Sequence, residues 1–213
     1  MAQVKICGLS EPITMKAALD AGADFVGLMF FTKSPRNVNI EQAAALAKMA
    51  KGKAAVVAVV VDADDKLLEL IAKRVHPDYI QAHGNETPAR VLEIVKLTGA
   101  KVIKVISVRD ATDVAKAQSY ERKADLIMFD AKAPENLAGA LPGGNGNSFD
   151  WSLMRGSSVR YMLAGGLNPE NVSEAIRVTG APIVDVSSGV ESAPGIKDVS
   201  FIRKFIEQAK LKG

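Results

Sequence analysis

Residues 54–61 read AAVVAVVV, an uninterrupted apolar run in which five of the eight residues are valine. β-branched residues favour strands, and a strand that is apolar on both faces is typical of a parallel sheet covered on both sides. A membrane-spanning helix needs about 20 apolar residues, so this run is too short to be one. It therefore predicts a buried parallel strand.

Seven other segments have the same character and are interpreted as strands. They are short, apolar and bounded by turn residues, and several of them do not alternate between apolar and polar positions. They are residues 4–7, 25–30, 79–83, 101–107, 125–130, 159–165 and 182–188.

Helical stretches lie between these strands. Many begin with Asp, Thr or Asn and several end at Gly, which are common helix start and stop signals. The predicted helices are residues 12–23, 39–52, 64–74, 87–99, 110–118, 168–180 and 198–210. We expect Ser10 to cap the first of them, and Pro88 and Pro169 to occupy first helical turns.

The alternation amounts to eight β-then-α units, which predicts a (β/α)8 TIM barrel. A doubly wound sheet is the rival, but its usual five or six strands would leave units unused. No Pro/Gly-rich linker divides the chain, so residues 1–213 are interpreted as one domain. Residues 131–151 form a long Gly/Pro/Asn-rich segment, and such a loop in a compact domain is more often functional than accidental.

Composition excludes several classes of protein. The net charge of +3 is carried by scattered residues and gives no argument for a nucleic-acid or membrane partner. The single cysteine excludes an internal disulfide, and with two histidines there is no CxxC or HxxxH spacing that would hold zinc, so we expect no metal site. The N-terminus lacks the regions of a signal peptide, which favours a cytoplasmic protein. The sequence leaves open whether it is a monomer or a homodimer.

Polar side chains stand where several predicted strands end. In a TIM barrel the active site lies at that end of the strands. Cys7 and Asp130 close two apolar strands, and His83 follows a third just before a glycine. A thiol at this rim can act as base or nucleophile if a neighbouring charge lowers its pKa, although a lone cysteine is as often a small buried apolar residue. Asp62 also ends a strand, but we expect it to cap the following helix. Asp185 is interpreted as orienting a loop or contacting a ligand.

Two glycine-rich loops follow the last two predicted strands. TIM barrels often bind phosphate with the loops after strands seven and eight and a nearby helix N-terminus. These loops contain Gly165 and Gly166 in the first and Ser188 and Gly189 in the second, which offer backbone N–H groups and a hydroxyl. Together they predict a phosphate-binding site.

The stretches VKICGL, GADFVGLMFFTKSPRNV, IQAHGNE, FDAKAP, LPGGNGNSFDW, LAGGLNPENV and VDVSSGVESAPGIKD run the length of the chain. In this order and spacing, the sequence resembles the N-(5'-phosphoribosyl)anthranilate isomerase family of tryptophan biosynthesis. The resemblance implies an Amadori rearrangement of an aminoaldose phosphate to an aminoketose phosphate, a reaction that requires no metal or organic cofactor. It makes Cys7 the general base and Asp130 the general acid.

The resemblance also implies how the substrate binds. Arg36 is expected to face the anthranilate carboxylate, because a guanidinium fork pairs with a carboxylate. Gly143, Gly144 and Gly146 are expected to join the phosphate site. His83 and Asp185 are expected to line the pocket around the sugar hydroxyls.

Two other functions remain open on the sequence. One is another phosphosugar barrel, such as an indole-glycerol-phosphate synthase. That reaction would need a lysine acid at a strand end and an added N-terminal segment, whereas Lys5 and Lys104 lie within predicted strands. The other is a catalytically silent barrel that binds a phosphorylated ligand, against which the intact Cys7 and Asp130 argue.

Overall fold

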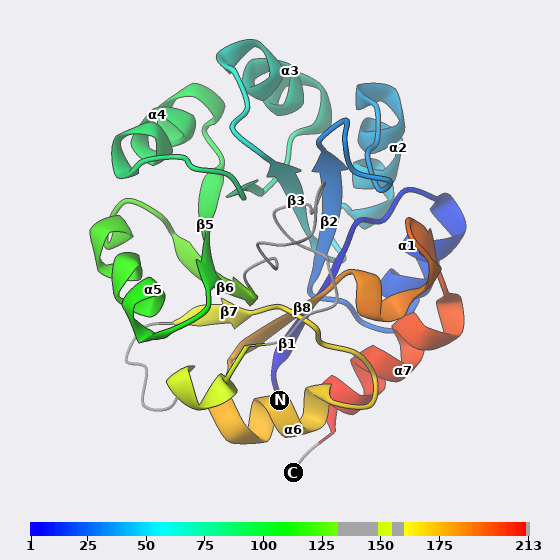
Figure 1. Ribbon diagram of the computed structural model, residues 1–213. Coiled ribbons are helices and arrows are strands. Elements are labelled where there is room, and N and C mark those ends of the chain that lie inside the picture. The colour runs from blue at the N-terminus through cyan, green and yellow to red at the C-terminus, as the bar shows by residue number, and fades with distance from the viewer. Residues whose placement is uncertain (132–148, 155–159, 212–213) are drawn as a thin grey trace.

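The protein forms a closed eight-stranded barrel, shown by a computed structural model that describes residues 1–131, 149–154 and 160–211 (Figure 1). Each of the eight strands runs parallel to the next along the chain, and the eighth pairs with the first. They are β1 (Gln3–Cys7), β2 (Phe25–Phe30), β3 (Ala55–Val60), β4 (Tyr79–Ala82), β5 (Lys101–Val108), β6 (Leu126–Ala131), β7 (Tyr161–Leu163) and β8 (Ile183–Val186). The predicted TIM barrel is confirmed.

Helices surround the strands as an outer ring (Figure 1). They are α1 (Pro12–Asp20), α2 (Ile40–Ala50), α3 (Asp65–Val75), α4 (Pro88–Thr98), α5 (Ala111–Ala115), α6 (Val172–Thr179) and α7 (Val199–Lys210). Short 3-10 helices occur at η1 (Lys116–Tyr120), η2 (Trp151–Met154) and η3 (Ser188–Val190). None of the helices within the described ranges has the length and hydropathy needed to cross a membrane.

Strand alternation divides the apolar core into two parts. Val4 and Ile6 of β1 point outward and belong to the large cluster between strands and helices. Cys7 points inward and belongs to a smaller cluster inside the barrel, with members such as Val57 and Met128. Because successive side chains of a strand point to opposite faces, the odd-numbered residues of β1 line the barrel interior.

Two predicted helix starts are wrong. Helix α1 begins at Pro12 with Glu11 as its N-cap and has no side-chain cap, so Ser10 does not cap it. Pro169 precedes α6, which begins at Val172 with Asn171 at its N-cap. Pro169 lies in a turn in which the Asn168 side-chain amide oxygen accepts from the backbone N–H groups of Glu170 and Asn171. Pro88 does begin α4, with Thr87 as its cap.

A small antiparallel hairpin between β8 and α7 was not predicted. It consists of β9 (Glu191–Ala193) and β10 (Ile196–Lys197). Strands of three and two residues are too short to show an alternating pattern. The predicted phosphate ligands Gly143, Gly144 and Gly146 lie outside the described residues.

Candidate active site

Four polar residues that the sequence singled out face the interior of the barrel or its rim. Cys7 ends β1, Asp130 lies on β6, His83 follows β4 and Asp185 lies on β8. Cys7 and Asp130 are each 5% exposed. The strands of a parallel barrel all end on the same side, so the barrel gathers at one end groups that are far apart in the sequence.

The Cys7 thiol is closely confined. A Cβ atom added to Gly27 on the adjacent strand would lie 2.8 Å from the Cys7 Sγ, so glycine makes the space that the sulfur fills. The Cys7 backbone carbonyl accepts a hydrogen bond of 3.2 Å from Ser187 Oγ. Lys197 Nζ donates in turn to the Ser187 carbonyl.

Opposing charges act on this thiol. Burial is the largest influence and raises the pKa of Cys7 above its ordinary value. The ammonium groups of Lys5 and Lys197 lower the pKa, while the Asp185 carboxylate raises it further. The net effect favours the protonated thiol, so the thiolate depends on the two lysines.

Asp130 lies close to His83, which follows β4 and contacts Gln81 on that strand. Its Oδ2 lies 3.3 Å from His83 Nε2, within ion-pair distance but without the geometry of a hydrogen bond. His83 Nδ1 lies 3.1 Å from the Gln81 amide nitrogen. With the Gln81 amide in this orientation its N–H donates to Nδ1, which leaves the proton of a neutral imidazole on Nε2, facing Asp130.

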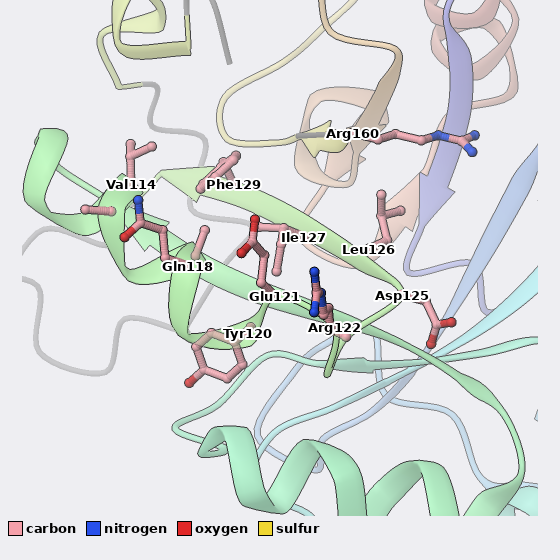
Figure 2. A pocket seen from close by; sticks show the side chains of 13 residues that line it. Val114, Gln118, Tyr120, Glu121, Arg122, Asp125, Leu126, Ile127, Phe129 and Arg160 are labelled. Atoms are coloured by element: carbon pink, nitrogen blue, oxygen red, sulfur yellow. The ribbon is translucent and has the colours of Figure 1, made fainter. Parts of the chain in front are cut away.

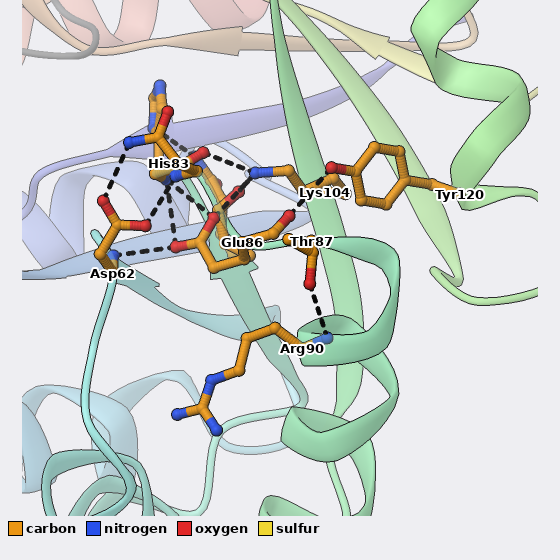
Figure 3. Close-up of polar contacts among 11 residues, drawn as sticks. Asp62, His83, Glu86, Thr87, Arg90, Lys104 and Tyr120 are labelled. Carbon is orange, nitrogen blue, oxygen red and sulfur yellow. Dashed lines mark hydrogen bonds and ion pairs between the residues drawn. The ribbon is translucent and has the colours of Figure 1, made fainter.

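Buried charged side chains stabilise the loop that carries His83 (Figure 3). The Glu86 carboxylate accepts from the backbone N–H groups of Asp62 and Gly84 and from Lys104 Nζ at 2.7 Å. The Asp62 carboxylate accepts from the Asn85 backbone N–H. The predicted capping role of Asp62 is therefore wrong: Asp62 holds this loop.

The cap of helix α3 is Asp64, whose carboxylate accepts from the Leu67 backbone N–H. Both aspartates follow the same strand, and a helix takes as its N-cap the residue directly before its first turn. The two positions could not be separated by spacing alone.

Arg36 is buried in a bidentate pair that the sequence did not predict. Its Nε and one terminal nitrogen donate to the two carboxylate oxygens of Glu191 at 2.7 and 2.8 Å. Lys197 Nζ adds a second contact of 2.7 Å to Glu191. Burial raises the pKa of Glu191, but the two cations lower it by more, so its pKa lies below the ordinary value.

The two predicted phosphate loops pack against each other. A Cβ atom at Gly189 would overlap the Leu167 carbonyl oxygen, so only glycine permits this contact. Gly165 and Gly166 have φ angles of 90° and 64°, in the left-handed region that favours glycine. Ser188 begins the 3-10 turn η3 beside them.

A separate pocket of about 450 Å³ lies on the outer side of β6 (Figure 2). Its lining includes Tyr120 of η1 and the outward-facing Ile127 and Phe129 of β6. Asp130 has the opposite parity on the same strand, so this pocket is distinct from the strand-end site. Within the described ranges, no group of three or more His, Cys, Asp or Glu residues is arranged to hold a metal ion.

Comparison with known proteins agrees with the geometry. A family model described as N-(5'-phosphoribosyl)anthranilate (PRA) isomerase matches residues 4–208. The chain belongs to this family.

Curated relatives and solved structures of N-(5'-phosphoribosyl)anthranilate isomerases match along nearly the whole chain. The protein of Parvibaculum lavamentivorans is 50% identical over 210 residues, which is 98% of both chains. That of Agrobacterium fabrum is 52% identical over 207 residues, or 96% of this chain and 93% of the relative. The crystal structure of the Thermotoga maritima isomerase superposes with a TM-score of 0.87 at 37% identity and covers 99% of both chains.

A further solved structure of this family contains a ligand. It is described as a complex with reduced 1-(o-carboxyphenylamino)-1-deoxyribulose 5-phosphate, and it superposes with a TM-score of 0.84 at 34% identity over 99% of each chain.

Four residues around the site were missed in the sequence. Lys5 and Gln81 lie two positions before Cys7 and His83, so strand alternation could have placed each pair on one face. Gly27 and Glu191 carried no local signal. Gly27 acts by having no side chain, and Glu191 meets Arg36 across 155 residues of sequence.

Proposed function

We propose that this protein converts N-(5'-phosphoribosyl)anthranilate into 1-(2-carboxyphenylamino)-1-deoxyribulose 5-phosphate, an isomerisation in tryptophan biosynthesis. One observation carries the proposal: a thiol and a carboxyl group, Cys7 and Asp130, face the same end of one barrel in a chain of this isomerase family. The reduced aminoketose phosphate bound by a related structure supports the identity of the product.

The first step opens the furanose ring, with Asp130 as general acid. Its carboxylic acid protonates the ring oxygen while the C1–O bond breaks, and the anthranilate nitrogen supplies the electron pair that forms the C1=N bond. Asp130 becomes a carboxylate, and His83, with its proton on Nε2, is positioned 3.3 Å away to face that charge. General acids of this kind typically contribute about 10² to 10⁴ in rate.

The second step moves hydrogen from C2 to C1, with Cys7 as general base. The thiolate removes the C2 proton, and the C–H electron pair forms the C1=C2 bond while the iminium nitrogen becomes neutral. The thiol then returns its proton to C1, and the C2 hydroxyl gives its proton to the Asp130 carboxylate as the ketone forms. Cys7 ends as thiolate and Asp130 as acid, so the cycle balances without any cofactor.

The remaining candidate residues anchor the substrate. Glu191 occupies Nε and one terminal nitrogen of Arg36, and we assign the other terminal nitrogen to the anthranilate carboxylate. Gly165, Gly166, Ser188 and Gly189 supply backbone and hydroxyl donors for the phosphate, which helix and loop N–H groups favour.

The partner is a phosphorylated small molecule, and a cytoplasmic location remains a prediction. Asp185 is bound to Lys5 at 2.7 Å, which makes it a support for the site as well as a candidate contact for the sugar.

The decisive experiment is continuous fluorescence of freshly generated phosphoribosylanthranilate with the purified protein. We expect wild type to abolish the anthranilate signal and Asp130→Asn to leave it at the rate of spontaneous decay. Asp125→Asn is the matched control, because this carboxylate binds the Val102 N–H at the other end of β6, and it is expected to retain wild-type turnover. If wild type also shows only spontaneous decay, the protein is a phosphate-binding barrel with another role.

A further inference from the structure

The barrel interior contains a charge that the mechanism above does not use. Lys5 lies on β1 and is 0% exposed, among the branched and apolar side chains that normally fill such a barrel. Its ammonium donates to Asp185 Oδ1 at 2.7 Å. Asp185 is also the residue that pairs with Lys5 in the register between β1 and β8.

Lys5 lies next to the proposed base, one inward-facing position earlier on β1. Lys5 and Cys7 are two residues apart on one strand, and both point into the barrel, whereas Val4 and Ile6 point outward. An ammonium has three donors. Asp185 takes one of them, and the side chain of Cys7 is the second group that interacts with Lys5.

The protonation of this lysine is settled by its neighbours. Burial lowers the pKa of Lys5, but Asp185 and Cys7 raise it by more, so the pKa lies above its ordinary value and the group remains an ammonium. The other titratable groups around the thiol are Asp185 on β8 and Lys197 on β10, with Asp130 and His83 across the rim.

A buried ion pair is a poor way to stabilise a core. Replacing such a pair by apolar residues of similar volume is often neutral or stabilising, because removing two charges from water costs as much as their attraction returns. The position of this pair next to a thiol that must ionise gives it a chemical use.

We propose that Lys5 is the counter-ion of the Cys7 thiolate, a positioning residue that keeps enough of the buried sulfur ionised for it to take the C2 proton. Asp185 sets how much of the ammonium charge the sulfur receives. This role rests on the proposed isomerase function, since it assigns Cys7 the part of the base.

In each turnover the charge on sulfur passes from −1 to zero as the S–H bond forms and the C2–H bond breaks. It returns to −1 when the proton moves to C1. Lys5 keeps its proton throughout, so it neither donates nor accepts one and its effect on rate passes entirely through the sulfur.

The test is titration of the Cys7 thiolate in the folded protein by its ultraviolet absorbance. Cys7 is the only cysteine, so subtracting the titration of Cys7→Ser removes the tyrosine signal and leaves one group. An opposite charge within reach shifts a pKa by about 1 to 3 units, so we expect Lys5→Met to move the midpoint upward by about one pH unit. Asp185→Asn should move it downward, because it removes the competing negative charge.

A purely structural role for the pair predicts a different result, in which both variants lose stability and neither midpoint moves. The double variant Lys5→Met/Asp185→Asn removes both charges together, so it remains measurable if the lone buried carboxylate prevents Lys5→Met from folding. Its midpoint is expected between those of wild type and Lys5→Met. Lys104→Met is the matched control: Lys104 is also buried and paired, but it faces away from the barrel interior, and its midpoint should equal that of wild type.

Activity is measured separately on the same variants. A tenfold smaller thiolate fraction should lower kcat about tenfold in Lys5→Met with little change in KM. Unchanged midpoints in Lys5→Met, the double variant and Asp185→Asn would overturn the role of Lys5. If the variants shift the midpoint as expected but the wild-type protein does not consume phosphoribosylanthranilate, the proposed function is overturned and the effect of Lys5 on the thiol stands.

Discussion

Lys5 and Lys104 are two buried lysines on parallel strands of the same barrel, and each lies 2.7 Å from a carboxylate. Lys5 faces inward, next to the Cys7 sulfur. Lys104 faces outward, and besides Glu86 it donates to the backbone carbonyls of Ala82 and Gly84. The first lysine therefore lies beside the proposed base, whereas the second holds a loop in shape.

The difference comes from strand parity. Side chains at alternate positions of a barrel strand enter either the interior or the layer below the helices. Near the rim, an inward-facing charged side chain lies beside the candidate substrate site. An outward-facing one contacts the βα loop that begins at the end of the strand. Similar ion pairs thus contribute to chemistry on one face of the sheet and to loop structure on the other.

The largest expected effect lies on the inward side, at Cys7. Replacing the thiol by a hydroxyl in Cys7→Ser removes the proposed base, and we expect kcat to fall about a thousandfold, which raises the barrier by about 4 kcal/mol. Substrate binding and thermal stability should change little because the two side chains are similar in size. Steady-state kinetics and thermal unfolding check this, and near wild-type turnover would remove Cys7 from the mechanism.

The next largest effect lies on the outward side. Glu86→Gln leaves Lys104 without its carboxylate, and breaking a buried pair in this way is expected to cost about 3 kcal/mol of unfolding free energy. The folded fraction should keep a kcat within about tenfold of wild type, since Glu86 does not face the substrate. Urea unfolding measures the loss. Glu93→Gln is the control, because the Glu93 side chain, which pairs with Arg90 on α4, is 62% exposed and pairs at the surface contribute about 0.2 to 1 kcal/mol. Equal losses of unfolding free energy in Glu86→Gln and Glu93→Gln would show that the buried Lys104–Glu86 pair matters no more than a surface pair.

The contribution of the Arg36–Glu191–Lys197 cluster to the free energy of unfolding should depend on pH. The pKa of Glu191 is lowered from its ordinary 4.5, so its contribution to stability is present above pH 4.5 and is lost as pH falls through the folded-state pKa. Glu191→Gln imitates the protonated acid. We expect it to be less stable than wild type by about 2 kcal/mol at neutral pH.

The unfolding free energies of wild type and Glu191→Gln should converge at low pH, where wild type also loses the carboxylate charge. Urea unfolding of both proteins at neutral pH and below pH 4 measures this. A difference that stays constant with pH would show that Glu191 acts through packing and not through its charge.

The smallest expected effect is steric. In Gly27→Ala the added Cβ would lie 2.8 Å from the Cys7 Sγ, which is too close, so the sulfur must move. We expect kcat to fall about tenfold, or about 1.4 kcal/mol, because catalysis depends on placing the base within a fraction of an ångström. KM should be nearly unchanged. A kcat equal to that of wild type would show that the sulfur has room to shift without consequence.

Much of the site could be predicted because it follows from position along the strands. Once apolar runs such as residues 54–61 are assigned as strands, the rule that catalytic groups lie at strand ends selects Cys7, His83 and Asp130. The resemblance of the surrounding motifs adds the chemistry. The same rule misassigned Asp62, because a carboxylate after a strand can bind either the next helix or the neighbouring loop, and only the positions of the N–H donors decide.

The sequence by itself determined the eightfold alternation, the barrel, the family and the placement of the candidate catalytic groups at one rim, since all of these follow from local periodicity and motif order. Only the tertiary structure decided the partners of the buried charges: Lys5 with Asp185 across 180 residues, and Arg36 with Glu191 across 155. The closed barrel brings β1 and β8 together, which joins Lys5 to Asp185, and the segments that follow β2 and β8 carry Arg36 and Glu191. No local pattern encodes either contact. The stability of a buried charge depends on which group lies within about 3 Å of it, so this property exists only in the folded chain.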